Sequence, residues 1–161
     1  MYMRGIRPAK LVLALALPQF IGFIGAIATT RSLDTWYQAL EKPALTPPSW
    51  VFGPVWTILY LMLGVALYLV WTRHVGGRAR RLWLRLFFVQ LALNALWSFL
   101  FFGLENPRLA FFEMLVLVAS IVGLILLALR FDKRVAGLLV PYLAWVSFAT
   151  YLTWAIWQLN P

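Results

Sequence analysis

Aromatic and amide side chains recur at helical spacing within two of the most apolar stretches of the sequence. In one stretch, Trp56 and Tyr60 are four residues apart. In another, Gln90, Asn94 and Trp97 follow one another at intervals of four and three residues. Side chains at these intervals lie on one face of a helix, so each stretch predicts a stripe that could contact a ligand. Amides inside hydrocarbon also form hydrogen bonds between helices, and that alternative use of Gln90 and Asn94 stays open.

A third stripe joins two aromatic residues to a small one. Tyr142, Trp145 and Ala149 are spaced three and four residues apart, directly after Pro141. Helix packing is the more common use of such a stripe. If the three stripes converge, they would instead line a pocket for a flat and largely apolar ligand.

The sequence offers little to acid–base, nucleophilic or metal chemistry. It has no cysteine, and its single histidine, His74, lies in a basic loop. No cluster of His, Asp or Glu has the spacing of zinc or di-iron ligands, so we expect no metal site and no required cofactor. No serine or lysine is paired in sequence with an obvious base that could activate it.

Glu113 is the one acidic residue inside an otherwise uncharged apolar stretch. Its place near the start of that stretch predicts that its carboxyl group reaches the membrane interface or pairs with Arg108. A proton-coupled transport role is the alternative, because ionisable groups within membrane spans often mark transport pathways.

These residues lie in segments that are long and apolar enough to cross a bilayer. Of the 161 residues, 63% are hydrophobic and 12% are charged, whereas soluble domains average about 25% charged residues. The mean hydropathy is +0.84, and a helix needs about 20 apolar residues to cross the hydrocarbon core. We therefore predict an all-α polytopic membrane protein, a single domain over residues 1–161 built as a bundle of five transmembrane helices, with spans at about 11–30, 51–72, 82–104, 109–129 and 136–159.

Short connections predict that the second to fifth spans pack as antiparallel neighbours. The first span is expected to remain as a helix, because its apolar run exceeds the roughly 7–15 residues of a signal peptide. Within it, Gly22 and Ala26 are four residues apart, a spacing of small residues that allows close helix contact within or between subunits.

Positive charge is concentrated in three segments of the chain. Residues 1–10, 73–85 and 130–134 carry eleven of the fourteen Lys and Arg residues, which leaves Arg31, Lys42 and Arg108 on the other side of the membrane. This asymmetry predicts a cytoplasmic N-terminus and a C-terminus outside. The net charge of +9 is therefore assigned to topology in a lipid bilayer, and no nucleic-acid partner is expected.

The connection at residues 31–50 is the longest between spans. Pro43, Pro47 and Pro48 prevent one continuous helix there. Trp36 and Trp50 make the segment apolar at the depth where aromatic residues gather in membrane proteins. The segment is predicted to be a lid over the mouth of the bundle, with a simple interfacial anchor as the alternative.

Four blocks of the sequence are long and unusual in composition: WYQALEKP, PPSWVFGPVWTILY, QLALNALWSFLFFG and PYLAWVSFATYL. They resemble the translocator protein family, also called the TspO or peripheral-type benzodiazepine receptor family and, in bacteria, the tryptophan-rich sensory proteins. With the five-span layout, the resemblance covers essentially the whole chain. It implies a five-helix bundle, usually a homodimer, whose cavity is closed by the first loop. Family ligands are tetrapyrroles such as protoporphyrin IX and haem, sterols, and synthetic benzodiazepine-site compounds.

The resemblance also implies roles for single positions. Trp56 and Trp145 match tryptophans of the family cavity, and Asn94 and Trp97 match cavity residues of the third span. Ala149 matches a position where a larger side chain is linked to altered ligand binding. Together with the stripes and the lid, this leads us to expect ligand contacts from Trp36, Pro47, Pro48, Trp56, Tyr60, Gln90, Asn94, Trp97, Tyr142, Trp145, Phe148 and Ala149.

The function implied is a binding, transport or sensory protein for tetrapyrroles in a bacterial cell membrane. The alternative is a light- or oxygen-dependent enzyme that degrades porphyrin, with Trp56 and Trp145 as the catalytic candidates. A sterol ligand is less favoured, because the C-terminal LTWAIWQLNP has neither the tyrosine nor the following basic residue of the sterol-recognition pattern.

Overall fold

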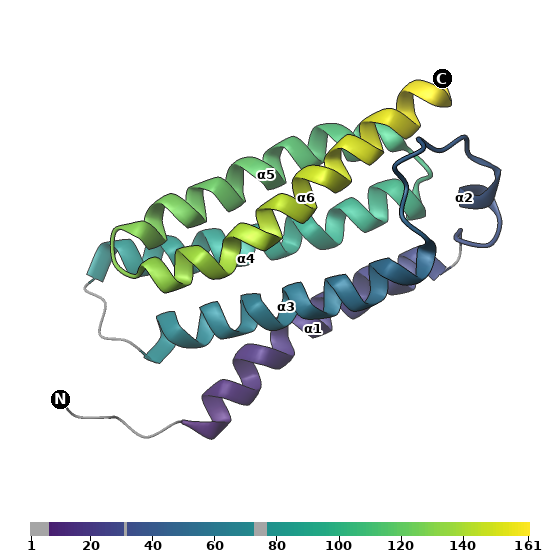
Figure 1. Cartoon of the computed structure of the whole chain (residues 1–161). Coiled ribbons are helices and arrows are strands. Elements are labelled where there is room, and N and C mark those ends of the chain that lie inside the picture. The colour runs from purple at the N-terminus through teal and green to yellow at the C-terminus, as the bar shows by residue number, and fades with distance from the viewer. Residues whose placement is uncertain (1–6, 31, 73–76) are drawn as a thin grey trace.

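The computed structural model describes residues 7–30, 32–72 and 77–161, and these form a bundle of long helices (Figure 1). A short helix, α2 (Trp36–Ala39), lies in the first loop, and η1 (Phe99–Gly103) is a π-helical turn that continues α4. Five helices are long and apolar enough to cross a membrane, which confirms the predicted all-α, five-span architecture. They are α1 (Pro8–Thr30), α3 (Ser49–Thr72), α4 (Gly77–Ser98), α5 (Pro107–Leu129) and α6 (Lys133–Leu159).

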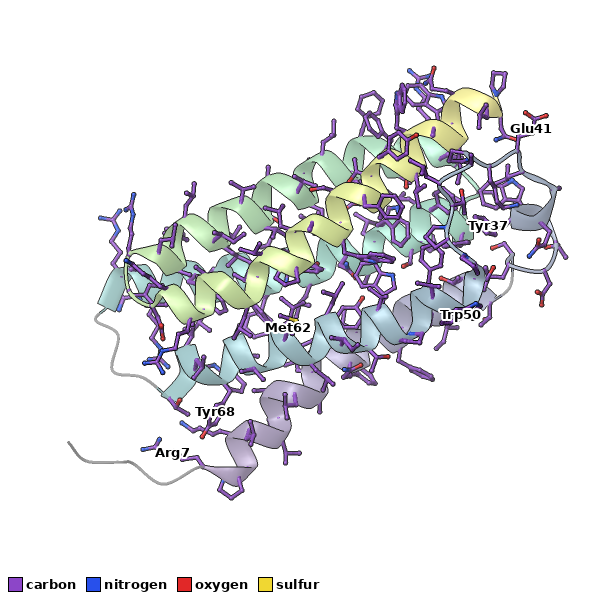
Figure 2. The ribbon with its side chains drawn as sticks, in the orientation of Figure 1. Arg7, Tyr37, Glu41, Trp50, Met62 and Tyr68 are labelled. Carbon is purple, nitrogen blue, oxygen red and sulfur yellow. The ribbon has the colours of Figure 1, made fainter. Side chains whose placement is uncertain are left out.

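The start of α1 and the end of α6 lie at opposite ends of the bundle (Figure 1). Just before α1, the Arg7 main-chain N–H donates to the Tyr68 hydroxyl at 3.2 Å. Figure 2 shows these two residues far from Tyr37 of the first loop. Which end is cytoplasmic stays a prediction. Of the residues used for it, Arg4, Arg31 and Arg73 lie outside the described residues, and so does the single histidine, His74.

Side-chain caps decide where two of the spans begin. The Asn106 Oδ1 accepts a hydrogen bond from the Leu109 N–H at 3.0 Å, with Pro107 at the first helical position. The Asp132 Oδ1 accepts from the Arg134 N–H at 3.0 Å. Both caps satisfy main-chain donors that a helix start leaves without partners. They place the starts of α5 and α6 two and three residues before the predicted spans at 109–129 and 136–159.

The helices are arranged around the bundle in the order α3, α1, α4, α5, α6. Pairs α4–α5 and α5–α6 are antiparallel neighbours, as expected from their short connections. The prediction was wrong for α3 and α4, which touch only slightly because α1 lies between them. Glycines make this possible: Gly22 faces the Tyr60 ring of α3, and a Cβ at Gly25 would lie 3.0 Å from the Ser98 Oγ of α4.

α1 and α3 approach each other most closely where Pro18 interrupts the hydrogen bonds of α1. A proline has no N–H, so the carbonyl of Ala14, four residues earlier, has lost its helical donor. Gly64 of α3 packs on this point: a Cβ there would lie 2.7 Å from the Leu15 Cα and 2.8 Å from the Ala14 carbonyl oxygen. The contact therefore depends on the missing side chain at Gly64.

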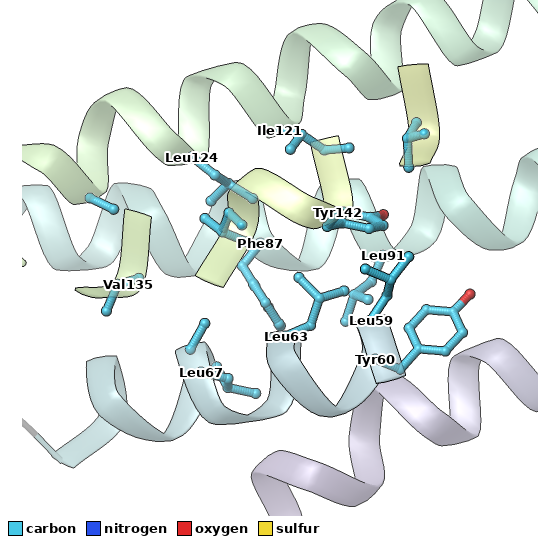
Figure 3. Close-up of a cluster of buried hydrophobic side chains, with 14 of the residues drawn as sticks. Leu59, Tyr60, Leu63, Leu67, Phe87, Leu91, Ile121, Leu124, Val135 and Tyr142 are labelled. Atoms are coloured by element: carbon cyan, nitrogen blue, oxygen red, sulfur yellow. The ribbon is translucent and has the colours of Figure 1, made fainter. Parts of the chain in front are cut away.

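A cluster of fully buried apolar side chains fills the middle of the bundle. Figure 3 shows Leu63 of α3, Phe87 of α4, and Ile121 and Leu124 of α5 within this cluster. Lipid is as apolar as these side chains, so their close packing, and not the removal of apolar surface from water, holds the helices together. Tyr60 and Tyr142 lie at the edge of the cluster with their hydroxyl groups pointing away from its centre (Figure 3).

Candidate ligand cavity

A cavity of about 650 Å³ lies between α1, α3, α4 with η1, and α6, and part of the first loop covers it. Its lining is mostly aromatic, aliphatic or small, with a few hydroxyl and amide groups. The lining residues are Gln19, Gly22, Phe23, Ala26, Thr29, Thr30, Leu33, Tyr37, Ser49, Phe52, Gly53, Trp56, Thr57, Tyr60, Asn94, Trp97, Ser98, Phe101, Phe102, Ala149, Leu152, Thr153 and Ile156.

Stacked aromatic rings form one wall of the cavity. Trp56 stacks on Tyr60 with ring centres 5.4 Å apart, and it lies 6.3 Å from Trp97. Trp97 in turn stacks on Phe101 at 5.9 Å. The indole N–H of Trp97 is buried and has no hydrogen-bond partner among the described residues. This wall therefore offers flat apolar faces to a ligand.

A chain of hydrogen bonds forms the polar floor beneath that wall. The Tyr60 hydroxyl donates to Asn94 Oδ1, and Asn94 Nδ2 donates to the Tyr142 hydroxyl at 3.1 Å. The Tyr142 hydroxyl then donates to Gln90 Oε1 at 2.7 Å. Tyr60 and Asn94 line the cavity, whereas Gln90 and Tyr142 lie behind them with no exposed surface. Gln90 and Asn94 thus form hydrogen bonds between helices, which was one of the two interpretations of the sequence. Asn94 also lines the cavity.

The π-helical turn η1 shapes the mouth of the cavity. A π-helix adds one residue to a helical turn and changes which side chains face a given side. Here the turn contains Phe101 and Phe102, whose rings meet edge to face at 4.8 Å and which both line the cavity. The main-chain carbonyl of Phe102 accepts a hydrogen bond from the Ser32 Oγ at 2.7 Å. The turn therefore joins the end of α4 to the first loop.

The first loop rests on these phenylalanines through two aromatic residues of α2. Trp36 meets Phe101 edge to face at 5.5 Å, and Tyr37 lies 5.6 Å from Phe102. The Lys42 Nζ sits over the Tyr37 ring, 4.7 Å from its centre. Removal of the Tyr37 hydroxyl from water raises the pKa of this group above its usual value near 10. The neutral phenol is therefore the form that fits the closed loop.

The structure brings five of the twelve expected ligand residues to the cavity: Trp56, Tyr60, Asn94, Trp97 and Ala149. Gln90 and Tyr142 form the layer behind the floor. The others lie outside the lining. Trp36 packs on Phe101, Pro47 and Pro48 lie in the loop just before α3, and Trp145 packs between Phe52 and Phe148 with ring centres 5.8 and 5.7 Å away. Ligand contact by any of the twelve stays a prediction.

Sequence reasoning did not assign the contribution of α1 to the cavity. Gly22, Phe23 and Ala26 line it, and Gln19 of the same helix bridges to α3, its Nε2 donating to the Thr57 carbonyl oxygen at 2.9 Å. The spacing of small residues in α1 was a signal for close contact. It could not reveal that Gly22 and Ala26 also leave room for a ligand.

The expected pairing of Glu113 with Arg108 was wrong. Both Glu113 carboxyl oxygens are buried without a hydrogen-bond partner in the described part of the chain. The Arg108 guanidinium instead lies over the Trp157 ring, 5.8 Å from its centre. Arg108 lies in the exposed first turn of α5, whereas Glu113, more than one turn later, has both carboxyl oxygens buried.

Within the described residues, no group of three or more His, Cys, Asp or Glu side chains is placed to hold a metal ion. The arrangement around the cavity is therefore one of stacking surfaces and neutral hydrogen-bonding groups. Such a site can bind and orient an apolar ligand through shape and a few polar contacts.

The chain is similar to known membrane proteins over most of its length. The model of the TspO/MBR family matches residues 14–158. A protein of Archaeoglobus fulgidus named Tryptophan-rich protein TspO is 41% identical over 151 residues, which cover 94% of this chain and 97% of the relative. The Translocator protein of Bos taurus is 36% identical, with 89% and 86% covered. Protein CrtK of Rhodobacter capsulatus is 31% identical, with 85% and 86% covered.

Proposed function

Because the chain belongs to the TspO/MBR family, we propose that this integral membrane protein binds tetrapyrroles such as protoporphyrin IX or haem in the cavity beneath its first loop. The names of its relatives support a membrane-embedded binding or sensory role. The choice of a tetrapyrrole as the ligand goes beyond these names and rests on the residues that line the cavity. A homodimer, implied by the family resemblance, also remains a prediction.

The observation that carries the proposal is the combination of flat aromatic walls with a narrow polar floor. Ligand cavities commonly enclose about 300–1,000 Å³, and this one encloses about 650 Å³. The Trp56 and Trp97 rings offer stacking faces, and the Tyr60–Asn94 pair offers hydrogen bonds. A planar macrocycle with an apolar body and a few polar groups matches this lining in chemistry.

Titration of the purified protein with protoporphyrin IX in the dark tests the proposal. Binding is followed by the porphyrin absorption band, since the variants change the tryptophan signal. We expect saturable binding that Trp56→Leu weakens about tenfold, because a lost aromatic contact costs about 1 kcal/mol or more beside the lost surface. Trp154→Leu is the matched control, since Trp154 is 43% exposed on α6 and does not line the cavity.

The outcome that would contradict the proposal is non-saturable uptake of porphyrin that is the same for wild type and Trp56→Leu. The variant Trp145→Leu adds a comparison. Trp145 reaches the cavity only through Phe52, so its replacement should weaken binding less than that of Trp56.

A second candidate function, light-dependent oxidation of bound porphyrin by dioxygen, is favoured by one observation. Trp56 and Trp97, with ring centres 6.3 Å apart, connect the cavity to further stacked rings and could relay an electron from or to an excited ligand. Illumination of the complex in air tests it. Loss of the porphyrin band with a new product, slowed in Trp56→Phe, would support an enzyme; a stable band would leave binding or sensing as the function.

A further inference from the structure

The four residues of the polar floor form a hydrogen-bonded relay with one end at the cavity and the other in the core. Tyr60 and Asn94 line the cavity, and their exposed fractions are 7% and 2%. Tyr142 and Gln90 have no exposed surface. The relay crosses from α3 to α4, then to α6, and returns to α4. Binding of a ligand in the cavity does not by itself require Tyr142 and Gln90.

The relay has a direction, and that direction leaves one group without a partner. Each hydroxyl and amide N–H donates inward from Tyr60 to Gln90, where Oε1 accepts the last hydrogen bond. Gln90 Nε2 is buried and has no hydrogen-bond partner among the described residues. A buried donor without an acceptor lowers stability. At the other end, the Tyr60 oxygen keeps its capacity to accept a hydrogen bond.

Half-turns of two amide groups reverse every hydrogen bond in the relay. With its oxygen and nitrogen exchanged, Gln90 Nε2 would donate to Tyr142, and the Tyr142 hydroxyl would donate to Asn94 Oδ1. Asn94 Nδ2 would then donate to Tyr60, whose O–H would be free to donate into the cavity. The same three contacts are kept. Gln90 Nε2 then has an acceptor, while the Gln90 oxygen takes the unpartnered position, and the new free donor of Tyr60 can be satisfied by a ligand acceptor.

We propose that Gln90 and Tyr142 are positioning residues that let the cavity floor present either an acceptor or a donor to the ligand. This inference rests on the proposed function of the cavity. A ligand N–H or O–H selects the inward direction and bonds the Tyr60 oxygen. A ligand carbonyl or carboxylate oxygen selects the outward direction and accepts from the Tyr60 hydroxyl. The ligand shifts the two populations by its different affinity for each.

The substitution Gln90→Met locks the relay in one direction. Methionine has nearly the same length, but its thioether sulfur is only a weak acceptor for the Tyr142 hydrogen. In the inward direction, that hydroxyl would then be a buried donor with a poor acceptor, so the outward direction is favoured. The Tyr60 hydroxyl would point its donor at the cavity, although Gln90 itself does not touch the ligand.

Three flat tricyclic probes of matched shape test the proposal. Carbazole carries one N–H donor, fluorenone carries one carbonyl acceptor, and fluorene carries neither. Their binding is measured by quenching of tryptophan fluorescence in wild type and in Gln90→Met. Comparison of each probe between two proteins cancels its partition into detergent. We expect the ratio of fluorenone affinity to carbazole affinity to rise about tenfold in Gln90→Met, with fluorene unchanged.

A double variant separates the relay from a structural effect. In Tyr142→Phe, the link between Gln90 and Asn94 is cut, so adding Gln90→Met should no longer change the affinity ratio. Equal changes for all three probes in Gln90→Met, or an undiminished shift in the Tyr142→Phe background, would overturn the relay while leaving the cavity as a binding site. A shift in the ratio without any binding of protoporphyrin IX would support the relay and contradict the tetrapyrrole. Failure of all three probes to bind wild type would overturn both.

Discussion

Asn160 and Glu41 are joined by two hydrogen bonds, although 119 residues separate them in sequence. The Glu41 main-chain N–H donates to Asn160 Oδ1 at 3.0 Å, and Asn160 Nδ2 donates to the Glu41 carbonyl oxygen at 2.9 Å. The side-chain amide thus pairs with the loop as a neighbouring main chain would. This amide clasp holds the outer part of the first loop on the end of α6.

Removal of the clasp should loosen the loop without unfolding the bundle. Asn160→Ala deletes both hydrogen bonds of the clasp, each of which contributes about 0.5–1.5 kcal/mol, and also the Nδ2 hydrogen bond to the Ile156 carbonyl oxygen. We expect faster hydrogen exchange at the Glu41 amide and release of bound porphyrin that is about five to 150 times faster. Exchange by mass spectrometry and stopped-flow dissociation measure the two effects.

Two variants control this prediction. Asn160→Asp keeps an acceptor for the Glu41 N–H but loses the donor, so its effect should be intermediate or close to that of alanine. Gln158→Ala changes an exposed residue of the same terminal turn and should leave both rates as in wild type. Identical dissociation rates in all four proteins would show that the clasp does not govern ligand exit.

The contact of α1 with α3 should be sensitive to a single methyl group at Gly64. A Cβ there would press on the backbone of Leu15, which cannot move aside as a flexible side chain could. Overpacking of this kind costs about 1–3 kcal/mol. We therefore expect Gly64→Ala to lower the midpoint of thermal unfolding in detergent.

Gly137→Ala is the matched control, because Gly137 lies within α6 and a Cβ there would meet nothing within 4 Å. Alanine at an open helical position is expected to stabilise by about 0.5–1 kcal/mol. A lower midpoint for Gly137→Ala than for Gly64→Ala would refute the account of the α1–α3 contact.

High pH should weaken the closure of the first loop through Tyr37. Burial raises the pKa of this hydroxyl above its usual value near 10, so the folded loop favours the neutral phenol. The contribution to stability is complete below about pH 10 and is lost as the pH rises through the higher pKa of the closed loop. Exchange protection of the loop should therefore fall as the pH rises above about 10. Tyr37→Phe has no such group, and its protection should fall less over the same pH rise. A parallel fall in both proteins would show that the effect does not come from the Tyr37 hydroxyl.

The sequence was sufficient for the spans and for part of the cavity, because charge-free length and helical spacing are local properties. They placed Tyr60 and Asn94 inside the bundle. Which hydroxyl meets which amide depends on contacts between helices, so the order of the relay could not be read from the spacing. The π-helical turn over FLFFG could not be predicted either, because these apolar residues are equally compatible with the end of an ordinary α-helical span. Gly22 contributes to the cavity by leaving space where a side chain would be, and a glycine in a sequence does not by itself indicate a ligand.

The two carboxyl oxygens of Glu113 are buried without a hydrogen-bond partner in the described part of the chain. A carboxylate away from water and without a partner is costly, whereas a neutral amide of the same shape costs less. We therefore expect Glu113→Gln to raise the midpoint of thermal unfolding, with a gain of about 1 kcal/mol, and to leave porphyrin affinity unchanged because Glu113 does not line the cavity. Glu105→Gln alters an exposed carboxyl group and should change neither quantity. A fall in stability in Glu113→Gln would mean that the carboxyl group makes a favourable interaction. If Glu113→Gln abolished proton-dependent uptake into vesicles without lowering the midpoint of thermal unfolding, that result would instead support a transport role for Glu113.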